Sequence, residues 1–295
     1  MALDVSRLGF RSQPEVVTWT TKESLLYALA VGAGQVDPSA ELAFTTENTE
    51  GIPQQVIPSF AVVLGFANGM PDVGTYDPTR AVHAEQTLDV EGPIAPEGRA
   101  EVTTTITEMW DKDPHAIVWT ETELRDIETN RLIARSRTGA FLGGAGGFGG
   151  ERGPSAAWSP PDRAPDAEVG FVTRPDQALL YRLTGDRNPL HSDPAFAARG
   201  GFPRPILHGM CTYGFAARLL VGELCAGDVA AFRGMSGRFA RPVFPGDALR
   251  LHVWRVEGGA SFRVLTDGGD VVIDRGHVEL APVTAPRSVT ESAPG

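Results

Sequence analysis

The feature that most constrains the fold is an internal repeat. Two proline-containing segments, PIAPEG from Pro93 and PVFPG from Pro242, lie 149 positions apart. Each is preceded by an apolar helical stretch (59–66 and 210–224) and followed by three strand-like segments with polar turns between them (100–107, 116–124 and 132–142; 249–256, 260–265 and 271–280). The period is too long for a solenoid. It predicts a duplicated α+β domain, in which each half lays one helix on a curved antiparallel sheet.

The two halves are separated by a change in composition. Residues 143–175 begin with a glycine tract and continue into a proline-rich run with few apolar residues. We therefore expect an N-terminal half at 1–150, a linker at 151–175, a C-terminal half at 176–285 and a flexible tail at 286–295.

The glycine tract contains a string that matches a dinucleotide-binding fingerprint. Residues 144–149 read GAGGFG and follow a predicted strand. The fingerprint requires a helix immediately afterwards, because the amino end of that helix binds the pyrophosphate. Here ERGP and further prolines follow, so we expect no nicotinamide site.

Charge and composition exclude several classes of protein. The chain has 26 Lys and Arg against 37 Asp and Glu, a formal net charge of −11, which argues against a nucleic-acid partner. No apolar run approaches the roughly 20 residues that span a bilayer, and the first residues do not resemble a signal peptide, so we expect a cytoplasmic protein without membrane contact. The six histidines include no pair at metal-ligand spacing, and we expect no metal.

The segment richest in reactive groups is Asp186-Arg187-Asn188-Pro189-Leu190-His191. On a helix, residues five apart would face about 140° away from each other. Pro189 prevents a helix here because it lacks an amide hydrogen and pushes Asn188 out of the helical region. We therefore expect an ordered loop that points Asp186 and His191 into one pocket, so that an acid, a base and an amide surround a single water.

A predicted helix begins at Gly209, shortly after this loop. Its amide is one of the unpaired donors of the first turn, where the helix dipole favours negative charge. Because glycine has no side chain, a ligand oxygen can approach closely, as an oxyanion hole requires. We expect the neighbouring His208 and Cys211 to pack rather than react.

These residues resemble the hydratase 2 family, the MaoC-like (R)-specific enoyl-CoA hydratases. The resemblance covers nearly the whole chain. It rests on the loop of residues 186–191 and on four further segments: YALAVGAG (27–34), GGFGG (146–150), ILHGMCT (206–212) and RFARPVFPG (238–246). The set is typical of two-domain members, similar to the hydratase part of peroxisomal multifunctional enzymes. The resemblance implies a double hot-dog fold with two antiparallel sheets, each wrapped on a central helix.

The resemblance also implies an activity and a set of site residues. The expected reaction is syn addition of water to a trans-2-enoyl-CoA, giving a (3R)-3-hydroxyacyl-CoA without a cofactor. Asp186, Asn188 and His191 would hold the water, with the division of roles between Asp186 and His191 left open, and the Gly209 amide would polarise the thioester carbonyl. Further substrate contacts are expected from Arg187, Pro189, Leu190 and Phe239, and from three residues of the first half, His83, Ala84 and Lys112.

In such two-domain proteins the first half lacks the catalytic loop and its freed space takes the acyl chain. This sequence agrees, because only Asp37-Pro38 stands near the equivalent position. We expect one site per chain and either a monomeric pseudo-dimer or a homodimer. Two alternatives remain: an acyl-CoA thioesterase on the same scaffold, since fold alone does not fix the reaction, and a non-catalytic acyl-CoA-binding protein.

Overall fold

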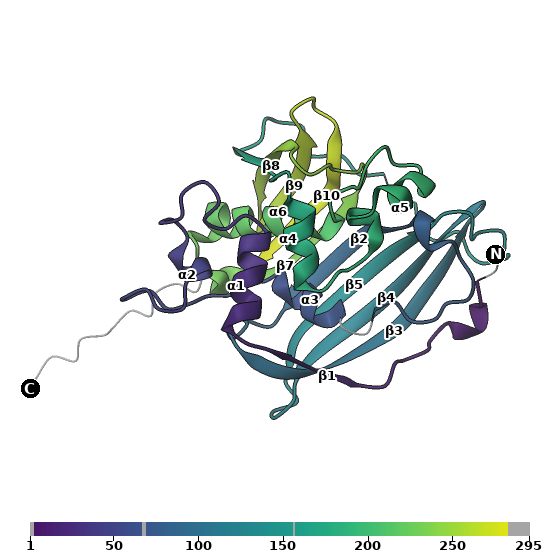
Figure 1. Ribbon diagram of the computed structural model, residues 1–295, viewed down its shortest axis with the longest axis horizontal. Coiled ribbons are helices and arrows are strands. Elements are labelled where there is room, and N and C mark those ends of the chain that lie inside the picture. The colour runs from purple at the N-terminus through teal and green to yellow at the C-terminus, as the bar shows by residue number, and fades with distance from the viewer. Residues whose placement is uncertain (1–2, 67–68, 156, 283–295) are drawn as a thin grey trace, which may run out of the picture.

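The computed structural model describes residues 3–66, 69–155 and 157–282. Ten strands form one sheet (Figure 1): β1 (Glu15–Trp19), β2 (Ala81–Val90), β3 (Gly98–Lys112), β4 (His115–Asp126), β5 (Leu132–Leu142), β6 (Ala167–Val172), β7 (Phe232–Phe239), β8 (Ala248–Val256), β9 (Gly259–Thr266) and β10 (Val271–Leu280). The helices are α1 (Thr21–Ala30), α2 (Leu42–Thr45), α3 (Phe60–Gly65), α4 (Gln177–Tyr181), α5 (Pro194–Arg199) and α6 (Gly209–Cys225). Short 3-10 turns connect several of them, among them η5 (Pro189–His191).

The order of the strands repeats from each outer edge towards the middle. It is β1-β3-β4-β5-β2 in the first half and, read from the other edge, β6-β8-β9-β10-β7 in the second. All neighbouring pairs are antiparallel. This symmetry is what a duplicated domain predicts, and each expected trio of strands is a meander.

The two sheets expected from the sequence are joined into one. Strand β2 pairs with β7 through residues 85–89 and 234–238, with Thr87 opposite Ser236. Pairing satisfies the backbone groups that both strands would otherwise leave open at an edge. The junction brings the first half beside the start of α6.

The helices of the two halves differ in length. In the second half α6 has 17 residues, twelve of them buried, and confirms the predicted helix at 210–224. The corresponding helix of the first half, α3, has only six residues and lies against β3, β4 and β5 (Figure 1). No helix among the described residues is long and apolar enough to cross a membrane.

The expected linker is shorter than predicted. Residues 167–172 within it form strand β6, which pairs with β8 at the edge of the sheet. Ala167, Val169 and Phe171 alternate towards the core, and this period of two was hidden by the prolines that precede them. The expected tail at 286–295 lies outside the described residues.

The glycine tract folds around a carboxylate. The amides of Gly147 and Gly149 donate to the two oxygens of Asp111 at 2.8 and 2.7 Å, and the Asp113 amide donates to one of them at 3.0 Å. These bonds hold the pKa of Asp111 below its ordinary value. Amides that would otherwise suit a phosphate are therefore already bonded to the protein's own carboxylate.

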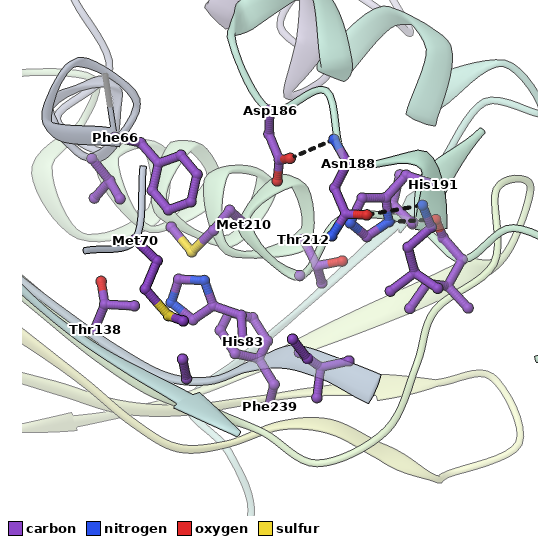
Figure 2. Close-up of a pocket in the computed structure, with 18 of the residues that line it drawn as sticks. Phe66, Met70, His83, Thr138, Asp186, Asn188, His191, Met210, Thr212 and Phe239 are labelled. Carbon is purple, nitrogen blue, oxygen red and sulfur yellow. Dashed lines mark hydrogen bonds between the residues drawn. The ribbon is translucent and has the colours of Figure 1, made fainter. Parts of the chain in front are cut away.

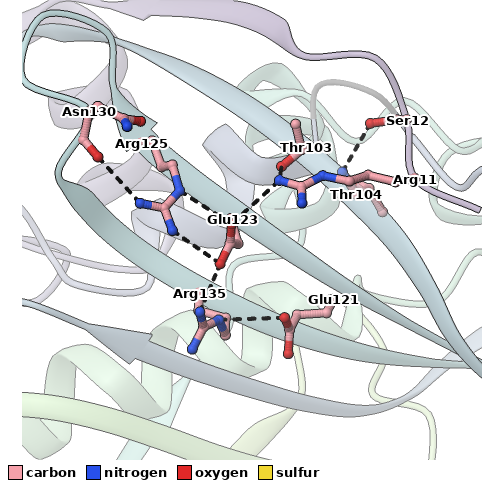
Figure 3. A network of polar contacts seen from close by, with 9 residues as sticks. All are labelled: Arg11, Ser12, Thr103, Thr104, Glu121, Glu123, Arg125, Asn130 and Arg135. Atoms are coloured by element: carbon pink, nitrogen blue, oxygen red, sulfur yellow. Dashed lines mark hydrogen bonds and ion pairs between the residues drawn. The ribbon is translucent and has the colours of Figure 1, made fainter. Parts of the chain in front are cut away.

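A network of charged side chains lies on the outer face of the first half's sheet (Figure 3). Glu123 on β4 receives hydrogen bonds from Arg125 and, at 2.7 Å, from Arg135 on β5, and Arg11 lies 3.7 Å away. Arg135 also lies 3.5 Å from Glu121. Successive residues of a strand point to opposite faces. Because these charged residues face outward, the residues that alternate with them on the same strands face inward.

Candidate active site

A cavity of about 380 Å³ lies where the two halves meet. Its walls come from the end of α3, the start of β2, the loop at 186–191, the start of α6, the end of β7 and the inner faces of β3, β4 and β5. Figure 2 shows His191 and Asn188 at one end of the cavity and Thr138 with Met70 at the other. The predicted loop and the predicted helix start therefore line one space.

Local hydrogen bonds fix the conformation of the loop. The backbone amide of Asn188 donates to Asp186 Oδ1 at 3.1 Å, and the side-chain oxygen Oδ1 of Asn188 accepts from the backbone amide of Leu190 at 3.0 Å. Pro189 opens the single turn η5, and Asp193 caps α5 directly afterwards. The side-chain oxygen of Asn188 thus caps η5. The side-chain NH₂ group of Asn188 is free to bond a ligand in the cavity that this residue lines.

His191 faces Asp186 across the loop. Its ring is buried, and Nδ1 donates to the carbonyl of Ile206 at 2.9 Å, which leaves a lone pair on Nε2. Burial lowers the pKa of His191, although the Ile206 carbonyl and the Asp186 charge oppose this, so the ring is neutral near pH 7. One side-chain ligand atom each from Asp186, His191 and His208 lie within 4.8 Å of one another.

His208 packs on His191, as expected from the sequence. The two ring centroids are 3.7 Å apart with 28° between the planes, and His208 Nε2 donates to the Asp186 carbonyl at 3.2 Å. Burial and the neighbouring His191 lower the pKa of His208 to about 2. The spacing of the three groups would suit a metal ion, and one nitrogen of each ring is already used in a hydrogen bond to a backbone carbonyl.

Gly209 is the first residue of α6 and lines the cavity. Its amide hydrogen has no hydrogen-bond acceptor among the described residues. A Cβ at this position would lie 3.1 Å from the ring of Phe239, closer than ordinary packing allows. Glycine therefore permits both the approach of Phe239 and that of a ligand oxygen.

The first half contributes His83 to the cavity. Its Nε2 donates to Gln86 Oε1 at 2.8 Å, and the same oxygen accepts from Thr138 at 2.8 Å. The His83 ring also meets Phe239 edge-on, with centroids 5.3 Å apart. Burial lowers the pKa of His83 to about 4, so this wall is uncharged near pH 7.

Several predicted substrate contacts lie elsewhere. Asp186, Asn188, Leu190, His191, Gly209, Phe239 and His83 line the cavity, whereas Ala84, Lys112, Arg187 and Pro189 are not part of its lining. Arg187 and Pro189 are exposed on the outer side of the loop. The Lys112 ammonium lies 5.1 Å from the ring centroid of Trp110 at the far end of β3. Their predicted contacts would have to be made outside the cavity.

Sequence reasoning missed several cavity residues. Thr212, one turn into α6, has a buried hydroxyl with no hydrogen-bond partner among the described residues. Threonine and serine side chains of β3, β4 and β5 line the distal end. A signal was present: the TETE run at 120–123 is polar on both faces of a strand, which is unusual unless one face borders a cavity.

Comparison with known proteins identifies the family. Residues 17–144 match the family model described as the MFE-2 hydratase 2 N-terminal domain, and residues 156–274 match the MaoC like domain. The 3-hydroxyacyl-thioester dehydratase Y of Mycobacterium tuberculosis is 46% identical over 290 residues, covering 95% of this chain and 99% of that protein. The chain belongs to the MaoC-like hydratase 2 family. A second member from the same bacterium, enoyl-CoA hydratase ChsH3, is 39% identical, with 95% and 98% covered.

Solved structures of MaoC-like proteins share the fold. The MaoC-like dehydratase from Phytophthora capsici has a TM-score of 0.81 at 30% identity, covering 94% of this chain and 98% of that one. A Mycobacterium tuberculosis protein described as a double hotdog fold has a TM-score of 0.61 at 15% identity, covering 92% and 96%, and compares in fold alone. The predicted α+β double hot-dog class and the resemblance to hydratase 2 are confirmed.

Proposed function

We propose that this protein is a lyase that reversibly hydrates trans-2-enoyl-CoA to (3R)-3-hydroxyacyl-CoA. The observation that carries the proposal is the meeting of Asp186 and His191 at one cavity, beside the first turn of α6. The names of the two Mycobacterium tuberculosis relatives, a 3-hydroxyacyl-thioester dehydratase and an enoyl-CoA hydratase, describe the two directions of this reaction and support it.

Asp186 and His191 carry the proton transfers. Hydration removes one proton from water, adds the hydroxyl group to the β-carbon and delivers one proton to the α-carbon. Because Asp186 and His191 reach the same space, the hydroxyl group and the proton add to one face of the double bond. The lone pair on His191 Nε2 is fixed by the Nδ1 bond to Ile206. The Asn188 amide group, whose oxygen is held by the Leu190 amide, orients the water.

The Gly209 amide stabilises the enolate-like charge on the thioester oxygen. It belongs to the first turn of a 17-residue helix, where unpaired amides and the helix dipole both favour a negative oxygen. The amide is held in place by the helix before the substrate binds, so little reorganisation is needed when charge develops.

The reaction needs only water and an acyl thioester, so the proposal includes no cofactor. Acyl-CoA is the partner we propose, with the CoA phosphates outside the cavity, where Arg187 and Lys112 are exposed or partly exposed. The cytoplasmic location and the choice between a monomeric pseudo-dimer and a homodimer stay predictions.

The test follows the ultraviolet absorbance of the conjugated thioester in crotonyl-CoA and longer enoyl-CoAs. We expect it to fall on addition of the protein, and chiral analysis of the product to give the (3R) alcohol. Asp186→Asn and His191→Ala should each lower kcat/KM by about 10²- to 10⁴-fold, the usual range for loss of a general acid or base.

Asp193→Asn is the matched control, because Asp193 lies in the same segment and only caps α5, which asparagine also does well. It should retain full turnover, and circular dichroism should show all three variants folded. Full activity in both site variants would defeat the proposal. Release of free thiol from a saturated acyl-CoA would identify a thioesterase instead.

A further inference from the structure

Five hydroxyl side chains form a belt across the inner face of the first half's sheet. Neighbouring positions of β3, β4 and β5 contribute them, and all five line the cavity: Thr104, Thr120, Thr122, Ser136 and Thr138. Thr122 stands opposite both Thr104 and Ser136, and Thr120 stands opposite Thr138. The belt is thus continuous over three strands.

Apolar side chains border the belt on both sides along the same strands. Val102 and Leu124 lie on one side, within the main core, and Ile106 and Val118 lie on the other, within a second apolar cluster. An inner face that is apolar at both ends and hydroxylated in the middle is not required for packing, because apolar residues at the middle positions would continue the core. The belt therefore indicates a place where hydroxyl side chains serve a purpose other than packing of the core.

Two of the hydroxyls lack partners. Thr104 and Thr122 bond to each other at 3.0 Å, and Thr138 donates to Gln86. Thr120 and Ser136 are each only 8% exposed, and neither hydroxyl has a hydrogen-bond partner among the described residues. Neither oxygen is among the fully buried side-chain atoms without a partner, so both hydroxyls are open to the cavity and can exchange hydrogen bonds with a polar group bound there.

The short helix α3 ends close against two of these residues. A Cβ added to Gly65, its last residue, would lie 3.1 Å from Thr122 Cγ2 and 3.9 Å from Ser136 Oγ. The helix thus ends in the one residue type that does not intrude on the belt. Figure 2 places Thr138 at the end of the cavity away from His191, so this end of the belt lies away from the proposed reaction.

We propose that the belt is a subsite for an uncharged polar group, a hydroxyl or keto oxygen, carried on the acyl chain remote from the thioester. The inference rests on the proposed function. Hydroxyl side chains both donate and accept, so they match an alcohol or a ketone equally well. A carboxylate is disfavoured because none of the five belt residues carries a positive charge to pair with it.

The test compares pairs of trans-2-enoyl-CoAs of six to twelve carbons, each with and without a terminal hydroxyl. At the chain length that reaches the belt, we expect the hydroxylated member to have an at least tenfold higher kcat/KM. The double variant Thr120→Val with Ser136→Ala should lose that preference, so that the hydroxylated and plain members of each pair have equal kcat/KM. Thr105→Val, on the outer face of β3, is the matched control and should keep it.

Isothermal titration of the matching saturated acyl-CoAs separates this inference from the proposed function. A tenfold tighter Kd for the hydroxylated ligand in the wild type alone supports the subsite even if no enoyl-CoA is hydrated. Equal kcat/KM and equal Kd within every pair would overturn it and leave the hydratase assignment intact. A preference that survives in the double variant would also overturn it.

Discussion

At the scale of single residues, the site is a stack of two neutral imidazoles beside one carboxylate. Both rings are buried, and burial is the largest cause of the lowered pKa of each. His208 donates a hydrogen bond to the Asp186 carbonyl, whereas His191 keeps Nε2 free because only its Nδ1 is bonded within the described part of the chain. A positioning role for His208 follows from these contacts, because its only described hydrogen bond is to the backbone of the loop.

The His208 ring makes stability depend on pH. An unfolded chain takes up a proton at this residue below about pH 6.5, whereas the folded protein resists until about pH 2. The unfolded state therefore binds more protons between these values, and the free energy of unfolding falls as pH is lowered. In His208→Phe we expect this slope to be shallower by up to about 1.4 kcal/mol per pH unit.

Urea unfolding at pH 6.5, 5.5 and 4.5 measures the slope. His277→Gln, which changes an exposed histidine of β10, is the control and should follow the wild type. An unchanged slope in His208→Phe would show that the ring does not exclude a proton in the folded state.

At the scale of elements, glycines let α6 cross the end of α1 at close range. A Cβ on Gly214 would lie 2.4 Å from Val31 Cγ1, and one on Gly32 would lie 2.2 Å from the Phe215 ring. Both distances are far below van der Waals contact. The pair of glycines sets how deeply the second half's helix seats against the first half, and with it the height of the Gly209 amide.

Two alanine substitutions in α6 should act in opposite directions. Gly214→Ala should lower the free energy of unfolding by about 1–3 kcal/mol, because the added methyl group overpacks the contact with Val31. Gly222→Ala should raise it by about 0.5–1 kcal/mol, since its Cβ meets nothing and alanine favours the helix. Chemical denaturation measures both, and a stabilised Gly214→Ala would refute the close crossing.

The elements also show how far the sequence could be interpreted. Its periodicity predicted α6 and both meanders, because those segments bury regular faces. It missed β6, an edge strand with a weak apolar alternation, and it missed the hydroxyl belt, because a polar inward face looks like a surface until its neighbours are known. The loop at 186–191 was predictable since Pro189 acts locally, whereas the stacking of His208 on His191 depends on tertiary packing.

At the scale of the whole molecule, the two halves share one core. The main apolar cluster includes Val102 and Leu124 of the first half together with Leu220 and Phe262 of the second. Arg218 on α6 reaches across to donate to both Glu41 oxygens at 2.7 Å, and its Nε donates to the Val31 carbonyl at 2.9 Å. Neither half is expected to hold its fold without the other.

We therefore expect a single unfolding transition. Arg218→Met should shift it as a whole by about 1.5–3 kcal/mol, the range for hydrogen bonds to a charged group, without splitting it. Hydrogen–deuterium exchange at rising denaturant, read at β4 and β9, checks this, because the amides of both strands should become exposed at the same denaturant concentration. Opening of one strand before the other would show that the halves unfold independently.

The pairing of β2 with β7 joins two halves that are encoded as separate parts of one chain, and this has a genetic consequence. In a complex of two identical subunits every codon change appears twice, so a residue that improves selectivity in one copy also enters the copy that performs the chemistry. Here the two copies are encoded separately. Ser136 can be substituted to suit a new substrate without any change in the loop at Asp186. The first half is therefore the natural target for redesigning the substrate specificity of this enzyme.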